Sequence, residues 1–426
     1  MQLIVHKSQL AGKVAVPASK SHTIRAVAIA SLAEGASILK NPLVSADTQA
    51  AVDCYRSLGA DIVTTNPRQW TVKGTSGIIL SHEQTIDVCN SGTTLRLAMG
   101  SAALAEQART TTFTGDAQIR NRSVAPLMAS LNELGAKCVS LRNNGKAPVK
   151  VTGRLKGGKT SIAAISSQYL SSLLLCTPLA ERDTEIDVTL LNEPGYVRMT
   201  FDWLDKQRIE YENLHFKKIR MRGKQHYKGF DITIPADFSS ATFFLCAAAL
   251  VADELTLTGL DFSDSQPDKA VVDYLKAMGA DIMVGGNLVT VKAAPLKGIE
   301  IDINSTPDAL PAMAVTAAFA EGTTKLLNVP QARGKETDRI ACMAQELKKM
   351  GIDAEELPDG LIVHHGKPRA ARLDGRCDHR IVMALSIAGL AADGDYTIDT
   401  AEAMSVTCPR YVELMRSVGA NMSLCD

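Results

Sequence analysis

The sequence predicts an α/β protein built from six related repeats that divide into two lobes of three. Three observations support this fold class. The chain has 426 residues, which is more than one hydrophobic core normally holds. A phrase in which an amphipathic helix ends at a glycine before a strand recurs along the whole chain. A second phrase recurs with the same period of about 70 residues.

The first phrase places a glycine directly after the last turn of a helix. Its clear copies are YRSLGADIVT, LNELGAKCVSL, LKAMGADIMV, LKKMGIDAEEL and LMRSVGANMSL, with Gly59, Gly135, Gly279, Gly351 and Gly419. Glycine suits this position because it adopts the left-handed conformation without a Cβ penalty. A degenerate sixth copy, LDKQRIEYEN, has Arg208 where the glycine would stand.

The second phrase joins the small-residue end of a helix to an alternating strand, as in LAEGASILKN, FAEGTTKLLN and LAADGDYTID. With the first phrase, it gives each repeat the order strand, helix, strand, helix, strand, strand. A repeat of this length is too long for a solenoid and suits a small α/β subdomain.

Composition excludes several classes of function. Lys+Arg and Asp+Glu are 46 each, so the chain has no basic field for nucleic acid. No apolar run is long enough to cross a membrane, and the first residues do not resemble a signal peptide, so we expect a cytoplasmic protein. The nine cysteines lack a CxxC pair and the eight histidines lack an HxxxH pair, so we expect neither disulfides nor a metal site. Most of the cysteines should be buried.

A polar cluster stands just before the first helix of each repeat. The clusters are SKSHTIR from Ser19, NSGTTLR from Asn90, SSQ from Ser166, ADFSSA from Ala236, TPDA from Thr306 and CDHR from Cys377. Ordinary N-capping explains their hydroxyl, amide and carboxylate groups, and it suffices for ADFSSA. It does not explain the nearby cations Lys20, Arg25, Arg96 and Arg380. A helix N-terminus beside a cation is suited to bind an anion, so the sequence predicts anionic ligands.

The stretch KETDR, residues 335–339, precedes the apolar-periodic run IACMAQELKKMG. As the first turn of a helix, it would place Lys335 and Arg339 on one face, where the two cations repel each other. They would also lie at the positive end of the helix dipole, which suits only Glu336 and Asp338. We therefore expect anionic ligands against the two cations, with Glu336 between them for proton transfer.

Together these stretches resemble the 5-enolpyruvylshikimate-3-phosphate (EPSP) synthase family, the 3-phosphoshikimate 1-carboxyvinyltransferases. The resemblance covers nearly the full length and rests on PASKSHTIRA, NSGTTLR, GDAQIRNR, SSQYLSSLLL, PADFSSATFFL, TPDALPAMAVTAAFAEGTT, RGKETDRI and DHRIVMALSIAGL. It implies a two-lobed inside-out α/β barrel with the active site in the cleft between the lobes. One lobe would comprise residues 20–234 and the other residues 1–19 and 235–426.

The resemblance also implies a reaction. The enolpyruvyl group of phosphoenolpyruvate would move to the 5-hydroxyl of shikimate 3-phosphate, with release of phosphate, in the pathway to chorismate and the aromatic amino acids. No cofactor is implied. The expected partners are the two small-molecule substrates, and the chain is expected to be a monomer. Gly92 leaves room for a glyphosate-type mimic of phosphoenolpyruvate.

The same resemblance gives individual residues their roles. The catalytic residues would be Asp308, Glu336 and Lys20, with the two carboxylates moving protons between the 5-hydroxyl and the methylene carbon. The residues expected to bind shikimate 3-phosphate are Lys20, Ser21, Arg25, Ser166, Ser167, Gln168, Asp308, Gln331 and Lys335. The residues expected to bind phosphoenolpyruvate are Lys20, Asn90, Gly92, Thr93, Arg122, Gln168, Arg339, His379 and Arg380.

Three positions depart from the family pattern. In a stretch that reads S-[KR]-P-Y in the family, Glu193 stands in place of a serine that helps bind the shikimate phosphate, although Tyr196 is retained. A carboxylate there repels a phosphate, so either Glu193 points away or the acceptor differs. Val406 replaces a lysine that contacts phosphoenolpyruvate, with Arg410 as a candidate substitute, and Gln331 replaces an asparagine.

The sequence alone leaves alternative functions open. A UDP-N-acetylglucosamine enolpyruvyl transferase would carry a reactive cysteine in the loop that reads GDAQIRNR in this chain. Glu193 favours an enolpyruvyl transferase acting on another hydroxylated phosphate, such as a nucleotide. A non-catalytic anion-binding relative would lose the acid pair and the cations, which are present. An RNA-processing enzyme of related architecture would need a basic surface.

Overall fold

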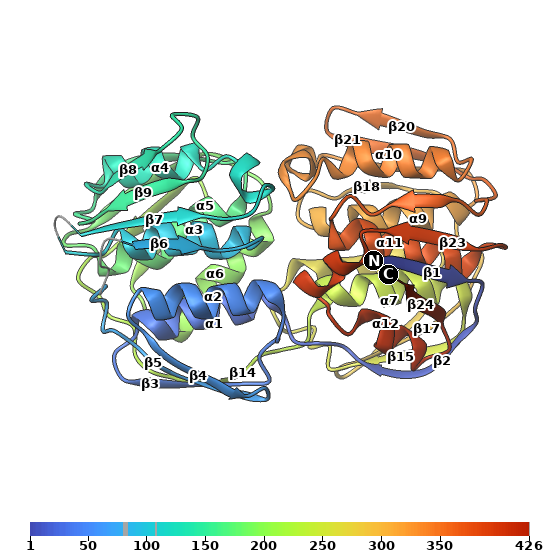
Figure 1. Ribbon diagram of the computed structural model, residues 1–426, viewed down its shortest axis with the longest axis horizontal. Helices are drawn as coiled ribbons and strands as arrows, with labels where there is room; N and C mark the ends of the chain where they lie inside the picture. Colours follow the sequence, from blue (N-terminus) through green and yellow to red (C-terminus); the bar gives the residue numbers. More distant parts are fainter. Residues whose placement is uncertain (80–83, 107–108, 426) are drawn as a thin grey trace. The chain divides into compact units, whose positions relative to one another are not determined.

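The computed structural model describes residues 1–79, 84–106 and 109–425, which form two compact units (Figure 1). Unit 1 comprises Met1–Pro17 and Pro235–Asp426, and unit 2 comprises Ala18–Ile234. Within the described residues, each unit has three four-stranded sheets and its own hydrophobic core. The α/β fold of six βαβαββ repeats is therefore as predicted from the sequence.

Unit 2 contains the first three repeats. The first consists of β14 (Asp231–Thr233), α1 (Lys20–Leu32), β3 (Ala36–Lys40), α2 (Ala46–Ser57), β4 (Asp61–Asn66) and β5 (Gln69–Lys73). The second consists of β6 (Gln84–Asp87), α3 (Gly92–Ala102), β7 (Thr110–Thr114), α4 (Ala125–Glu133), β8 (Lys137–Ser140) and β9 (Val149–Thr152). The third consists of β10 (Gly158–Ala164), α5 (Ser167–Cys176), β11 (Thr184–Leu191), α6 (Pro194–Lys206), β12 (Tyr211–Leu214) and β13 (Lys218–Met221).

Unit 1 contains the other three. The fourth repeat consists of β2 (Leu10–Ala15), α7 (Phe238–Val251), β15 (Ala252–Thr258), α8 (Ala270–Ala277), β16 (Asp281–Gly285) and β17 (Leu288–Lys292). The fifth consists of β18 (Glu300–Asp302), α9 (Leu310–Phe319), β19 (Thr323–Leu327), α10 (Arg339–Lys349), β20 (Ala354–Leu357) and β21 (Gly360–His364). The sixth consists of β22 (Arg372–Asp374), α11 (His379–Ala391), β23 (Tyr396–Asp399), α12 (Tyr411–Arg416), β24 (Asn421–Cys425) and β1 (Gln2–His6).

Short 3₁₀ helices connect these elements. They are η1 (Ile119–Asn121), η2 (Thr177–Leu179), η3 (Pro267–Lys269), η4 (Pro307–Ala309), η5 (Pro330–Gly334) and η6 (Ala401–Val406). η4 carries the predicted site residue Asp308 just before α9, and η5 carries Gln331 between β19 and α10.

Every sheet repeats one strand order. The second repeat gives β6-β7-β9-β8, in which β6 is parallel to β7 and the remaining neighbours are antiparallel. The third gives β10-β11-β13-β12 and the fifth gives β18-β19-β21-β20. A parallel pair needs a crossover connection, and in the second, third, fifth and sixth repeats the first helix supplies it.

Strands from distant parts of the chain complete the remaining sheets. β2 pairs in parallel with β15 in unit 1, whereas β14 pairs in parallel with β3 in unit 2. β1 lies between β23 and β24, antiparallel to both, so Figure 1 shows the blue N-terminal strand among red C-terminal elements. The chain therefore passes from unit 1 to unit 2 and back again.

The first helix of each repeat lies in the interior. Along α7 and α9, nearly every side chain is buried, and α9 contacts both α7 and α11. In unit 2, α3 contacts both α1 and α5. α7 and α9 are rich in alanine, which allows close packing of their backbones. Sheet strands such as β5 (Gln69–Lys73) bury alternate residues and expose the others, so the helices are inside and the sheets outside.

The helix-ending glycines adopt the conformation that the sequence predicts. Their φ angles are left-handed at Gly59, Gly135, Gly279, Gly351 and Gly419. The degenerate copy takes the same geometry without glycine, because Arg208 has φ +57°. The backbone therefore follows the repeat even where the sequence does not.

Arg208 gives a first prediction. A left-handed residue with a Cβ costs roughly 1–2 kcal/mol, and the Arg208 side chain is exposed. We expect Arg208→Gly to stabilise unit 2 by ~0.5–1 kcal/mol, after the larger unfolded-state entropy of glycine is subtracted. Thermal unfolding followed by circular dichroism measures this. Gly279→Ala, with φ +103°, is the opposite control and should lower the midpoint. A lower midpoint for Arg208→Gly would contradict the strain argument.

One expectation about local structure needs correction. KETDR is not a helical turn, because α10 begins at Arg339 and the side chain of Asp338 caps it by accepting from the N–H of Ala341. Lys335 has an extended backbone after η5 (Pro330–Gly334). The two cations therefore do not share a helical face.

Most of the cysteines are buried, as the sequence predicts. The cysteines are free, and five are buried, whereas Cys89, Cys377 and Cys425 are exposed. In the part of the chain that the structure describes, none of the helices combines the length and apolarity needed to span a membrane.

Candidate functional site

The predicted site residues form separate groups in the two units. Those with numbers from 20 to 168 belong to unit 2, whereas Asp308, Gln331, Lys335, Glu336, Arg339, His379 and Arg380 belong to unit 1.

In unit 2, the start of α5 is occupied by a carboxylate. Ser166 caps the helix by accepting from the N–H of Gln168 at 3.4 Å. Ser167 donates both of its polar hydrogens to Glu193 Oε2, with N···O 3.2 Å and Oγ···O 2.5 Å. Glu193 is 1% exposed and has φ +58°. The sequence left two alternatives open, that Glu193 points away from the shikimate phosphate or that the acceptor differs. In the structure, Glu193 points towards Ser167, which is one of the residues expected to bind shikimate 3-phosphate.

Arg25 lies next to this carboxylate, in the interior. Its guanidinium donates to four uncharged oxygens, those of the Thr200 hydroxyl (3.0 Å), the Ser21 carbonyl (3.1 Å), the Tyr196 carbonyl (3.2 Å) and the Ser171 hydroxyl (3.4 Å). Burial lowers the pKa of Arg25 to about 10, against the opposing effects of Tyr196 and Glu193. The buried guanidinium therefore donates its hydrogen bonds to neutral oxygens and has Glu193 as a charged neighbour.

The start of α3 gathers a second set of donors. Arg96 donates to Gln168 Oε1 at 2.8 Å, and the Gln168 amide donates to the Thr93 hydroxyl at 3.0 Å. Arg96 is 2% exposed and also lies over the Tyr169 ring. The sequence marked Arg96 as a cation at a helix start but assigned it no substrate. In the structure it contacts Gln168, which was assigned to both substrates.

Gly92 lies directly against two guanidinium groups. A Cβ built on Gly92 would collide with Arg96, and it would lie 2.6 Å from Nη1 of Arg122. The backbone of α3 therefore starts close to both cations, which is the close approach that glycine permits. This is also where the sequence predicted that phosphoenolpyruvate binds.

This contact gives a second prediction. Gly92→Ala should push the Arg96 and Arg122 side chains apart, because two guanidinium ends cannot remain at such distances from a methyl group. We expect KM for phosphoenolpyruvate to rise by about tenfold, equivalent to ~1.4 kcal/mol of binding. Steady-state kinetics against phosphoenolpyruvate measures this change. An alanine variant with unchanged KM would show that neither guanidinium contacts this substrate.

Lys20 pairs with a carboxylate, and Asn90 donates to a carboxylate and to a side-chain amide. Lys20 Nζ lies 3.1 Å from Asp47 Oδ2, and both side chains are largely buried. Asn90 donates to Asp116 Oδ2 at 2.6 Å and to Gln118 Oε1 at 2.5 Å. Sequence reasoning missed Asp47, although its place in the first turn of α2 after the Ser45 capping box resembles the other polar helix starts.

In unit 1, the predicted cations converge on Asp308. Its Oδ1 lies 2.7 Å from Nη1 of Arg339 and 3.9 Å from Nζ of Lys335, and its Oδ2 lies 3.0 Å from Nη2 of Arg380. Asp308 stands in η4 (Pro307–Ala309), immediately before the buried helix α9. The sequence marked these four residues in three separate polar clusters, and the structure places the three cations around Asp308.

Arg339 contacts three carboxylates. It donates to Asp378 at 2.8 and 3.2 Å, to Glu336 Oε2 at 2.6 Å and to Asp308 at 2.7 Å, and it is 1% exposed. Burial acts to lower the pKa of Arg339, but Asp378, Glu336 and Asp308 together raise it above its ordinary value. Burial acts to raise the pKa of Asp378, yet Arg339 holds it below the usual value. Sequence reasoning assigned no role to Asp378, which also caps α11 through the N–H of Arg380.

The remaining predicted residues of unit 1 are less directly connected. The Gln331 amide donates to the Asn304 carbonyl at 2.8 Å. His379 is buried, with Nδ1 3.9 Å from Asp378 Oδ1. Arg410, the candidate substitute for the lysine replaced by Val406, is exposed and pairs with Glu413 at 2.9 and 2.5 Å. That ion pair lies in the first turn of α12 (Tyr411–Arg416).

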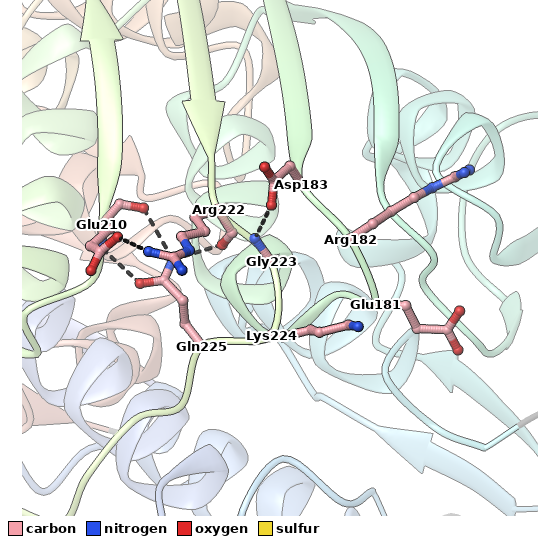
Figure 2. Close-up of a pocket in the computed structure, with 8 residues that line it drawn as sticks. All are labelled: Glu181, Arg182, Asp183, Glu210, Arg222, Gly223, Lys224 and Gln225. Carbon is pink, nitrogen blue, oxygen red and sulfur yellow. Dashed lines mark hydrogen bonds and ion pairs between the residues drawn. The ribbon is translucent and has the colours of Figure 1, made fainter.

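A surface pocket of about 710 Å³ in unit 2 is separate from these groups (Figure 2). It is lined by Glu181, Arg182, Asp183, Glu210, Arg222, Gly223, Lys224 and Gln225. Figure 2 shows Arg222 paired with Glu210, at 2.5 Å, and Asp183 accepting from the N–H of Gly223. Its acidic and basic side chains balance, so it offers no net charge to the expected anions, and no predicted site residue lines it.

Comparison with known proteins decides the family. The family described as EPSP synthase (3-phosphoshikimate 1-carboxyvinyltransferase) matches residues 4–415. The chain belongs to the EPSP synthase family. A 3-phosphoshikimate 1-carboxyvinyltransferase of Acetivibrio thermocellus is 51% identical over 426 residues, with 100% of each chain covered. One of Ruminiclostridium cellulolyticum is 50% identical, also with 100% of each chain covered.

A solved structure agrees with this assignment. The EPSP synthase of Acinetobacter baumannii superposes with a TM-score of 0.81 at 28% identity, covering 99% of this chain and 100% of that one. The similarity extends over both units, so family membership does not rest on one shared domain.

Proposed function

We propose that the protein transfers the enolpyruvyl group of phosphoenolpyruvate to the 5-hydroxyl of shikimate 3-phosphate, giving EPSP and phosphate. The observation that carries the proposal is the convergence of Arg339, Arg380 and Lys335 on Asp308, in a chain of the EPSP synthase family. A carboxylate among cations suits a reaction of two multiply anionic substrates that also needs proton transfer.

The substrates are proposed to take over the cations from the carboxylates. Phosphoenolpyruvate would bind Arg339 and Arg380, which releases Asp308 from these two ion pairs. Asp308 or Glu336 then accepts the proton of the 5-hydroxyl as its oxygen forms a bond to C2 of phosphoenolpyruvate, while an acid adds a proton to C3. Removal of a proton from the new methyl group and departure of phosphate complete the transfer. General acid–base assistance of this kind contributes about 10²–10⁴ in rate.

The acceptor is proposed to use the unit 2 residues. Arg25 offers a buried cation, and Ser166, Ser167 and Gln168 offer donors at the start of α5. Lys20 would act on both substrates, and its ion pair with Asp47 fixes the position of its ammonium group.

The test is a phosphate-release assay with purified protein. We expect release from phosphoenolpyruvate with shikimate 3-phosphate and none with UDP-N-acetylglucosamine. Release with the sugar nucleotide alone would overturn the proposal. Release with neither acceptor, followed by release with a nucleotide, would favour the other-acceptor alternative, which the position of Glu193 supports.

Finer properties are proposed on the same basis. We infer that the protein works as a cytoplasmic monomer, so gel filtration should give a mass near 45.5 kDa. A glyphosate-type inhibitor should compete with phosphoenolpyruvate near Gly92. Elution as a dimer would contradict the first inference, and uncompetitive behaviour towards phosphoenolpyruvate would contradict the second.

A further inference from the structure

Glu193 has an unusual backbone conformation for its residue type. It is left-handed, with φ +58° and ψ 49°, and Pro194 follows it. A side chain with a Cβ is strained in this region, and a following proline normally requires an extended backbone. Strain of this kind persists where surrounding contacts impose it, and it often marks a functional site.

The side chain of Glu193 explains what the strained backbone achieves. It is 1% exposed, and its Oε2 accepts from both the N–H and the hydroxyl of Ser167, the first residue of α5. The N-terminus of a helix is favourable for negative charge. The donors that would serve a phosphate at this helix are thus already bound to an anion that the chain itself supplies.

The charge of Glu193 also acts on Arg25. The guanidinium of Arg25 donates to four uncharged oxygens, and Glu193 contributes to the negative potential around it. When an acceptor brings a phosphate to Ser167, the N–H and hydroxyl of Ser167 are therefore already bound to the buried carboxylate of Glu193. Like charges in such proximity oppose binding unless one is displaced.

We propose that Glu193 determines acceptor affinity by competing with the phosphate of the acceptor for the N–H and hydroxyl of Ser167. The competition acts on acceptors that carry a phosphate and not on the rest of the acceptor. This inference rests on the proposed function, because it assumes that the acceptor phosphate binds at the start of α5.

Glu193→Gln tests the competition, because glutamine keeps the size and one acceptor oxygen but removes the charge. We expect KM for shikimate 3-phosphate to fall at least fivefold. At saturating phosphoenolpyruvate, the constant for inhibition by inorganic phosphate against shikimate 3-phosphate should fall by a similar factor. KM for phosphoenolpyruvate and the inhibition constant of shikimate, which lacks the phosphate, should change less than twofold. A merely structural role would not separate phosphorylated from unphosphorylated ligands.

Glu133→Gln is the matched control. Glu133 Oε2 likewise accepts from one hydroxyl and one N–H, those of Thr160 at 2.6 Å and Ser161 at 3.4 Å, but it is exposed and lies outside the predicted site. If Glu193→Gln does not fold, Glu193→Asn removes the charge with a residue that tolerates the left-handed conformation.

The outcomes separate the two proposals. An unchanged or higher KM for shikimate 3-phosphate in a folded Glu193 variant, with an active unmodified protein, overturns the competition alone. An equal fall for shikimate and for its phosphate also overturns it. An unmodified protein that releases no phosphate with shikimate 3-phosphate overturns the proposed function itself.

Discussion

Asp308→Asn is expected to lower turnover by at least ~10² and to leave the fold intact. Asparagine keeps the shape of aspartate, but its amide cannot accept and release a proton as the carboxyl group does. The fold should survive because Arg339 retains Glu336 and Asp378 as partners, at 2.6 and 2.8 Å. The loss should therefore appear in kcat, whereas the free energy of unfolding should change little.

Steady-state phosphate release and circular dichroism measure the two quantities. Asp353→Asn in the same unit is a suitable control, because that carboxylate is exposed and lies 4.0 Å from His364 Nε2. The control should keep full turnover. Nearly unchanged turnover in a folded Asp308→Asn protein would exclude Asp308 from the mechanism, and the same test applied to Glu336→Gln would then identify the remaining carboxylate.

The repeats could be predicted from sequence because their signal is local. A glycine after a helix marks the same left-handed turn five times, and the polar clusters mark the buried helix starts. Such features depend on neighbouring residues alone, so they are visible without coordinates. The family resemblance, and not a local pattern, implied that Asp308, Lys335, Arg339 and Arg380 serve one site, and their ion pairs with Asp308 are visible only in the structure.

The start of α10 could not be predicted in the same way. Taken locally, KETDR pairs Lys335 with Arg339 on one helical face. In the structure, Asp338 takes the N-cap and Arg339 turns to carboxylates from distant parts of the sequence, Asp308 and Asp378. The apparent repulsion is absent because the helix begins at Arg339 and not at Lys335, and Asp308 lies close to both cations.

Glu193 and Asp47 show the same limit. The contact of Glu193 with Ser167 spans 26 residues, and the position of the carboxylate depends on a left-handed backbone that no local pattern favours before proline. Asp47 pairs with Lys20 because α1 packs on α2. Tertiary packing, and not residue type, determines both contacts.

Arg339→Met should strongly destabilise unit 1. It removes the cation shared by Asp308, Glu336 and Asp378, and leaves the fully buried Asp378 carboxylate near the half-buried Glu336 and Asp308. Breaking a buried ion pair by removing one partner costs about 3–5 kcal/mol. Urea unfolding at neutral pH should show a loss of this size for unit 1. Adding Asp378→Asn should recover part of it, because asparagine still caps α11 while one unpaired charge is removed.

The pH dependence of this loss identifies its origin. In the unmodified protein, Arg339 holds the pKa of Asp378 below its usual value. The stability from this pair is therefore present above the unfolded carboxyl pKa of about 3.9 and is lost as pH falls through the lower folded pKa. Without the cation, burial and the neighbouring Glu336 raise the folded pKa of Asp378 instead, so the variant loses stability as pH rises. The difference between the two proteins should thus be largest near pH 7 and should shrink towards pH 4. A difference that stays constant with pH would mean that lost packing of the arginine stem, rather than unpaired charge, causes the destabilisation.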